Sequence, residues 1–238
     1  MIRLEKKWVL VTGASRGIGL RIAKALAPMG CKLILHARKL ENTRQLVTEL
    51  TTAGHEVYNV AAEFNSVSEV NALIETVREI TSDHLDVLYN NAAIMTDYQP
   101  VFKPTVEEYK TSFMINTIVP AKLCDAFIPG MLARNWGRVI NVSSGINNEP
   151  GLMAYSCSKA ALDRYVRDMI PTLKGSNVLM NLLDPGWLRT DMGGANADND
   201  PDSVVPGALV PVLIEKEAGS GELYHALQYV GENLADFL

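Results

Sequence analysis

The sequence TGASRGIG, residues 12–19, decides the fold of this chain of 238 residues. It directly follows the apolar run WVLV (Trp8–Val11), whose β-forming residues predict a buried strand that ends at Gly13. Apolar residues then recur at helical spacing as far as Gly30, so a helix is expected after the glycines. A strand, a glycine turn and a helix in this order predict the first unit of an α/β fold.

Short apolar runs alternate with longer amphipathic stretches along the rest of the chain. The runs that predict further strands are residues 32–36, 57–61, 85–89, 138–142, 178–183 and 222–224. The stretches that predict further helices are residues 40–53, 66–80, 105–134 with a kink or division at Pro120, 153–173 and 203–214. Parallel strands need such crossover helices. We therefore expect one doubly wound, Rossmann-like α/β domain over residues 1–238, with a parallel sheet of about seven strands and helices on both faces.

The composition excludes several classes of function. The formal net charge is −5 and no lysine–arginine cluster stands out, so we expect no nucleic-acid partner. The first apolar run is too short for a signal peptide or a membrane span, which favours a cytoplasmic protein without a membrane partner. Cys31, Cys124 and Cys157 are too scattered for disulfides or a zinc site and indicate a reducing compartment. The histidines show no metal-ligand spacing, so no metal is expected.

Polar or turn-forming residues follow several of the predicted strands. They are the glycine turn, the pair Asn90-Asn91, the pair Ser143-Ser144 and the turn Pro185-Gly186. The carboxyl ends of parallel strands meet at one edge of the sheet, where such folds bind their ligands. We therefore expect these segments to form one site.

The glycine turn suits a nucleotide pyrophosphate. Gly13 permits a sharp turn, while Gly17 and Gly19 let phosphates approach the N–H groups at the positive end of the helix. The spacing differs from G-x-G-x-x-G, and the Gly-Lys-Ser/Thr ending of an ATP or GTP loop is absent. The alternative is a plain turn that caps the helix.

The residues after the second predicted strand bear on the choice of nucleotide. Folds that bind NAD often carry a carboxylate there, whereas the 2′-phosphate of NADP needs a cation. Ala37 leaves that acid out and Arg38 supplies a planar donor fork, with Arg16 in reach from the glycine turn. This pattern favours NADP(H). The alternative is that both arginines are solvated surface charges.

Tyr155 and Lys159 are four residues apart, so they lie on one face of the predicted helix. A nearby ammonium favours the phenolate, so we expect Lys159 to lower the pKa of Tyr155. Such a phenol can give a proton to a carbonyl or take one from an alcohol. On its own the pair is more often a surface pair, and Ser143-Ser144 just upstream strengthens the catalytic interpretation.

These motifs occur together in one order. They are TGASRGIG, Asn90-Asn91-Ala92-Ala93, Asn116 within MINT, Val142-Ser143-Ser144, Tyr155-x-x-x-Lys159 and Pro185-Gly186-x-x-x-Thr190. In this respect the chain resembles the short-chain dehydrogenase/reductase family, in its single-domain NADP-preferring branch, over nearly its whole length.

The resemblance implies a role for each matching residue. Tyr155 is the expected general acid/base, and Lys159 lowers the tyrosine pKa and binds the nicotinamide ribose. Ser144 orients the substrate carbonyl, and Asn116 holds a water that links the lysine to solvent. The expected cofactor-binding residues are Gly13, Ser15, Arg16, Gly17, Ile18, Gly19, Arg38, Glu63, Phe64, Asn90, Ala92, Tyr155, Lys159, Pro185, Gly186, Leu188 and Thr190.

The chain departs from the family pattern in three places. Ala93 replaces the last glycine of Asn-Asn-Ala-Gly, and Glu63 stands where an aspartate near the adenine is usual. The interval from Ser144 to Tyr155 is shorter than is usual, which leaves Ser143 as a rival for the catalytic serine, although Ser144 matches the motif.

The expected activity is NADP(H)-dependent hydride transfer between a carbonyl and an alcohol. Apolar residues beside the site predict a small, fairly apolar substrate; they are Ile94, Met95, Leu152, Met153, Trp187 and Met192. The small and polar residues 193–201 are expected to form a mobile lid. The resemblance implies a homodimer or homotetramer through the helices at 105–134 and 153–173. The alternatives are a reductase of acyl-carrier-bound ketoesters or of sugars on the same scaffold, and a non-catalytic NADPH-binding sensor.

Overall fold

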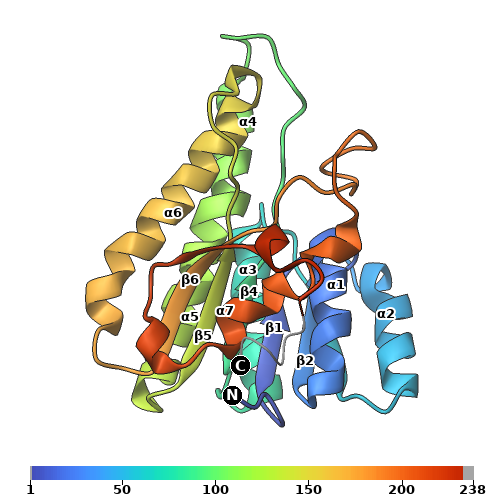
Figure 1. Cartoon of the computed structure of the whole chain (residues 1–238), viewed down its shortest axis with the longest axis vertical. Coiled ribbons are helices and arrows are strands. Elements are labelled where there is room, and N and C mark those ends of the chain that lie inside the picture. Colours follow the sequence, from blue (N-terminus) through green and yellow to red (C-terminus); the bar gives the residue numbers. More distant parts are fainter. Residues whose placement is uncertain (1, 233–238) are drawn as a thin grey trace.

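A parallel sheet crosses the molecule from one side to the other (Figure 1). The computed structural model describes residues 2–232, and within them the sheet has seven strands in the order β3-β2-β1-β4-β5-β6-β7. The strands are β1 (Trp8–Val11), β2 (Lys32–Ala37), β3 (Val57–Ala61), β4 (Val87–Asn90), β5 (Gly137–Val142), β6 (Val178–Asp184) and β7 (Leu223–His225). All neighbouring strands pair in parallel, as the alternation of strands and helices predicts.

Helices cover both faces of this sheet, so the doubly wound α/β class is confirmed. The helices are α1 (Gly17–Leu26), α2 (Glu41–Thr52), α3 (Val67–Thr81), α4 (Val106–Phe113), α5 (Val119–Ala133), α6 (Met153–Leu173) and α7 (Val210–Leu213). Val9 and Val11 of β1 pack into the buried cluster beneath α1, α2 and α7. Leu10 between them packs into the opposite cluster, beneath α3, α5 and α6. This alternation is why the strands are apolar throughout.

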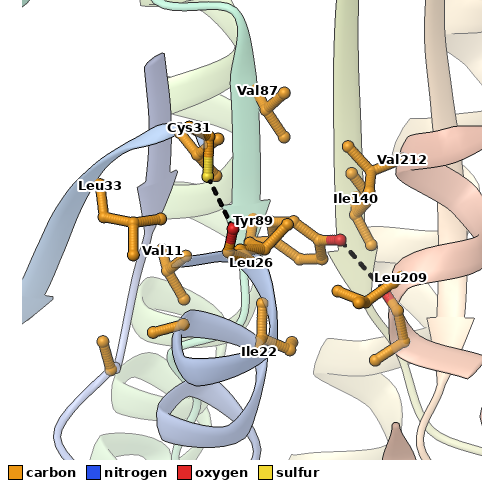
Figure 2. Packing of buried hydrophobic residues seen from close by; sticks show 14 of the residues in the cluster. Val11, Ile22, Leu26, Cys31, Leu33, Val87, Tyr89, Ile140, Leu209 and Val212 are labelled. Atoms are coloured by element: carbon orange, nitrogen blue, oxygen red, sulfur yellow. Dashed lines mark hydrogen bonds between the residues drawn. The ribbon is translucent and has the colours of Figure 1, made fainter. Parts of the chain in front are cut away.

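Tyr89 anchors the first of these clusters (Figure 2). Its ring is fully buried on β4, and its hydroxyl donates a hydrogen bond of 3.1 Å to the main-chain oxygen of Ala208. Cys31 lies in the same cluster and donates to the oxygen of Leu26 (3.2 Å). The hydroxyl therefore ties the centre of the sheet to the segment before α7, which covers that face.

The expected helix over residues 105–134 is divided, and the division lies just before Pro120. The capping box of Thr105 and Glu108 begins α4, a π-helical turn (Met114–Ile118) follows, and α5 then carries Pro120 in its first turn. Pro120 has no N–H to donate to the carbonyl of Asn116 four residues earlier, so a regular α-helical ladder cannot run through this point. The turn places Asn116 inside the molecule, fully buried.

The expected helix over residues 203–214 is wrong. The chain there forms the 3₁₀ turns Pro201–Val204 and Gly207–Leu209, and only one α-helical turn, α7. Pro206 and Pro211 remove two main-chain donors within a few residues, which a continuous helix does not tolerate. The apolar periodicity instead reflects burial, because Val204, Leu209 and Leu213 all enter the core.

Among residues 2–232, no helix combines the length and the apolar character needed to cross a bilayer.

The anchoring role of Tyr89 can be measured. Tyr89→Phe leaves the oxygen of Ala208 without its donor inside the core, so we expect a loss of about 1.5 kcal/mol in the free energy of unfolding. The matched control is Tyr58→Phe, because that hydroxyl is 3.5 Å from Glu56 and its ring is 41% exposed. Urea unfolding should show a change within about 0.5 kcal/mol for the control. Equal values for the two variants would contradict the anchoring role.

Candidate active site

The glycine turn after β1 leaves the start of α1 open. Gly13 and Gly17 have φ of +67° and +56°, and a Cβ on Gly19 would lie 2.4 Å from the oxygen of Gly13. No side chain caps α1 and no acidic residue lies in its first turn. By contrast, Ser66 caps α3 and Thr105 caps α4. The uncapped N–H groups and the positive end of the helix dipole fit an anion such as a pyrophosphate.

Thr12 and Asn91 lock this turn to the end of β4. The hydroxyl of Thr12 accepts from the N–H groups of Asn91 (2.9 Å) and Ala92 (3.0 Å) and donates to the oxygen of Tyr89. The amide of Asn91 donates to the oxygens of Thr12 (2.8 Å) and Gly13 (3.2 Å). No individual role for Asn91 was expected from the sequence, although its place directly after a predicted strand was the available signal.

His36 holds the same turn from the side of β2. Its Nδ1 lies 3.3 Å from the N–H of Gly13 and its Nε2 3.0 Å from the oxygen of Ala62, while its ring stacks on Phe64. An acceptor at Nδ1 requires the proton on Nε2, which then donates to Ala62. Burial lowers the pKa of His36 to about 4, against the smaller opposite effect of the bond to Ala62. The neutral ring is therefore part of the framework, a role that sequence spacing did not reveal.

The two arginines expected near a 2′-phosphate differ in their surroundings. Arg38 is exposed just after β2, and its side chain makes no hydrogen bond or ion pair with the residues that the structure describes. Arg16 pairs with Asp191 at 3.0 Å, and both side chains are mostly exposed. Ala37 is buried and brings no acid to this place. Arg38 is thus the cation at hand for a phosphate, and Arg16 must first leave Asp191.

The side chains of Asn90 and Phe64 point into the protein interior. Asn90 donates to Oδ1 of Asn141 (2.9 Å) on β5 and to the oxygen of Pro120, so a contact from Asn90 to a nucleotide has to come from its main chain. Phe64 is 4% exposed beneath His36. Glu63 is half-buried, and its carboxylate accepts from the N–H of Asn65 (3.3 Å).

The two serines after β5 have different partners. The hydroxyl of Ser143 is buried and donates to Oδ1 of Asp163 on α6 at 2.5 Å. Ser144 is half-buried, and its hydroxyl accepts from the N–H of Ile146 and interacts with the Tyr155 side chain by a hydrogen bond. Of the two, Ser144 is the one that faces the phenol.

Tyr155 and Lys159 lie together on α6 and are both buried. Burial raises the pKa of Tyr155, the bond to Ser144 opposes this and the charge of Asp184 adds to it. The net shift of the Tyr155 pKa is therefore upward, the opposite of the lowering that was expected from Lys159. The ammonium lies 6.0 Å from the ring centroid and donates instead to the oxygen of Val142 (2.7 Å). Burial also lowers the pKa of Lys159, to about 8.

Asn116 is hydrogen-bonded to α6 next to Tyr155 and Lys159. Its Oδ1 accepts from the N–H of Ile94, and its Nδ2 donates to the oxygen of Ile94 (both 2.8 Å) and to the hydroxyl of Ser158 (2.9 Å). Ser158 in turn donates to the oxygen of Tyr155. Both N–H groups of the amide are thus used within the protein, and the expected water at Asn116 stays a prediction.

The segment after β6 closes over the glycine turn. Thr190 is the neighbour that a Cβ on Gly17 would meet, at 3.7 Å. Leu188 is buried, while Gly186 follows Pro185 with φ of +77°. Residues 193–201, expected to be a mobile lid, fold back on this segment.

Specific hydrogen bonds fix that fold. The indole of Trp187 donates to the oxygen of Gly193 (2.9 Å). The main-chain N–H of Arg189 donates to the oxygen of Asn199, and the N–H of Asn199 donates to the oxygen of Trp187. Trp187, Met192 and Met153 are 53%, 39% and 37% exposed. They leave an apolar surface near the site, and the apolar substrate pocket stays a prediction.

The comparisons with known proteins agree with this geometry. The family model described as short chain dehydrogenase matches residues 7–201. The chain is 35% identical to the oxidoreductase YvrD of Bacillus subtilis (strain 168), over 98% of this chain and 92% of that protein. The chain belongs to the short-chain dehydrogenase family, and the expectation of that family is confirmed.

Solved structures show the same fold. A 3-oxoacyl (acyl-carrier-protein) reductase from Agrobacterium tumefaciens C58 with NADP bound has a TM-score of 0.83 and 26% identity, with 93% of each chain covered. An NADPH-bound carbonyl reductase from chicken fatty liver has a TM-score of 0.82 and 25% identity, covering 97% of this chain and 100% of that one.

The buried His36 makes stability depend on pH. A pKa near 4 in the folded chain, against about 6.5 when unfolded, means that the unfolded state binds the extra proton first as the pH falls. Stability from this group is complete above pH ~6.5, and we expect about 3 kcal/mol to be lost by pH ~4. His36→Asn keeps an acceptor for Gly13 without a titrating ring. The difference in unfolding free energy between wild type and variant should therefore shrink over this window, and a constant difference would contradict the burial argument.

Proposed function

We propose that this chain is an NADP(H)-dependent oxidoreductase that interconverts a carbonyl and an alcohol on a small, fairly apolar substrate. The observation that carries the proposal is the meeting of two features at one edge of the sheet. The open start of α1 is suited to a pyrophosphate, and the half-buried Ser144 beside the buried Tyr155 and Lys159 is suited to proton transfer.

The cofactor is assigned by the charges around the glycine turn. The N–H groups at Gly17 to Gly19 would hold the pyrophosphate, Arg38 the 2′-phosphate, and Thr190 would lie against the nicotinamide end. Two solved structures of this fold carry NADP or NADPH in their descriptions, which supports the choice. When bound, the cofactor supplies or accepts the hydride.

The protein's own groups move the proton. Because burial raises the pKa of Tyr155, its hydroxyl stays protonated near neutral pH and is ready to donate to a carbonyl oxygen. Ser144, bonded to the same phenol, would orient that oxygen. Lys159, with a pKa of about 8, is mostly charged at neutral pH and stabilises negative charge that develops on the tyrosine as the proton leaves.

Two other functions were open from the sequence. A reductase of acyl-carrier-bound ketoesters is supported by the description of the relative from Agrobacterium tumefaciens C58. For a sugar substrate, the site offers no feature that favours it over an apolar substrate. A non-catalytic sensor has no need of a buried Tyr155 beside a buried Lys159, whereas proton transfer uses both.

We place the enzyme in a reducing compartment, the cytoplasm, as a homodimer or homotetramer. The three cysteines are free within the described chain, which suits such a compartment. Ile118 of the π-helical turn is 51% exposed between α4 and α5, on the face that we assign to subunit contact.

Replacing the acid/base should separate binding from chemistry. We expect Tyr155→Phe to bind NADPH as the wild type does and to lose turnover by a factor of at least ~10², typical of a missing proton donor. Tyr165→Phe is the control, since that hydroxyl lies on the same helix but bonds to Asp125. Fluorescence titration with NADPH and rates on a panel of ketones give both quantities. Turnover of Tyr155→Phe within a few-fold of the control would rule out the assignment.

Replacing Arg38 should change the choice of cofactor. Losing one charge-assisted hydrogen bond costs on the order of 1.5–3 kcal/mol, so Arg38→Ala should weaken NADPH by roughly ten- to a hundred-fold. NADH should bind nearly as before, and Ala37→Asp combined with Arg38→Ala should favour NADH. Arg44→Ala, an exposed change on α2, is the control. Unchanged kcat/KM for NADPH in Arg38→Ala would show that Arg38 is a surface charge.

A further inference from the structure

Lys159 is a buried cation whose hydrogen-bond acceptor carries no charge. Its side chain is 4% exposed, and its ammonium donates to the oxygen of Val142, a neutral acceptor. Among the residues described, Asp163 is the carboxylate whose charge acts on Lys159. A buried ammonium without a counter-charge would tend to lose its proton.

Asp163 lies one helical turn after Lys159 on α6 and is joined to the same end of β5. Lys159 bonds to the oxygen of Val142, and the next residue, Ser143, donates its hydroxyl to Asp163 at 2.5 Å. Two consecutive residues, Val142 and Ser143, thus hold the ammonium of Lys159 and the carboxylate of Asp163. The carboxylate is fixed in place without occupying Ser144.

We propose that Asp163 is a positioning residue of the active site, which acts through Lys159 as its half-buried counter-ion and is itself held by Ser143. The sequence alone predicts no role for Asp163, and Ser143 was expected only as a rival catalytic serine. The inference rests on the proposed function, because Lys159 matters to the reaction only if Tyr155 transfers the proton.

The other charges near Asp163 are few in the described chain. Arg167 on α6 and Lys159 favour its ionised form, and Asp184 at the end of β6 disfavours it. Asp184 is in turn paired with His225 at the end of β7 (3.2 Å). Burial raises the pKa of Asp163, and the hydrogen bond from Ser143 opposes this. The hydrogen bond from Ser143 and the charges of Arg167 and Lys159 thus all favour the ionised carboxylate that Lys159 requires.

The test is a titration of Lys159 by ¹³C NMR at its Cε, on the chain without substrate. The signal is assigned by its loss in Lys159→Met. We expect a midpoint of about 8 in the wild type. Asp163→Asn, which can still accept from Ser143, should lower it by at least ~0.5 pH unit. Asp163→Glu keeps the negative charge, so its Lys159 midpoint should lie close to that of the wild type. Asp168→Asn, an exposed change on the same helix, should leave the midpoint unchanged.

Reciprocity gives a second measurement if Asp163→Asn folds poorly. Two coupled groups shift each other's pKa, so Lys159→Met should raise the pKa of Asp163. This pKa is followed by ¹³C NMR at the carboxyl carbon of Asp163. An unchanged Lys159 midpoint in folded Asp163→Asn, or an unchanged Asp163 midpoint in Lys159→Met, would overturn the proposal.

The kinetic readout separates positioning from a merely structural role. Asp163→Asn should slow ketone reduction ~3-fold more at pH ~8.5 than at pH ~6.5, because Lys159 loses its proton earlier. Equal slowing at both values would also overturn it. The NMR midpoints do not depend on turnover. If the proposed function is wrong, the wild type reduces no ketone, or Tyr155→Phe turns over within a few-fold of its control.

Discussion

The position of the hydroxyl of Thr12 between β1 and β4 is the constraint on which the candidate site depends. In a parallel sheet all strands end at one edge, but the loops that leave that edge need not stay together. The bonds of Thr12 to Tyr89, Asn91 and Ala92 join the glycine turn to the loop after β4. From the other side, His36 joins the turn to β2 and β3. The start of α1 is thus open to a ligand while the turn that precedes it is rigid.

Burial governs the chemistry at this edge. Tyr155 and Lys159 are shielded by the π-helical turn and by the end of β5, and in each the uncharged form is favoured by desolvation. A protonated phenol beside a partly charged lysine is a pair prepared to release one proton to a substrate oxygen. The network from Ser143 to Asp163 limits how far Lys159 is driven toward neutrality. Packing, rather than the spacing of the two residues alone, therefore sets their protonation.

The sequence was sufficient wherever a local pattern determines the outcome. The strand ends, the glycine turn and the Tyr155–Lys159 face of α6 follow from apolar periodicity and from glycine geometry. The roles of His36 and Asp163 could not be predicted, because each is defined by a partner on another element, Gly13 and Ser143. The pKa of Tyr155 was predicted in the wrong direction, since spacing reports a neighbouring charge but not desolvation. The C-terminal helix was mispredicted because helical periodicity was weighed above Pro206 and Pro211.

The central claim is that this edge transfers a hydride between NADP(H) and a carbonyl carbon. The most direct measurement uses two samples of NADPH, each deuterated on a different face of nicotinamide C4. Each sample is incubated with the wild-type enzyme and a small apolar ketone. We expect the alcohol to carry one deuterium on its carbinol carbon with label from one face only, as a fixed nicotinamide requires. Alcohol without deuterium from either labelled face, or no alcohol from any ketone although NADPH is bound, would contradict the account.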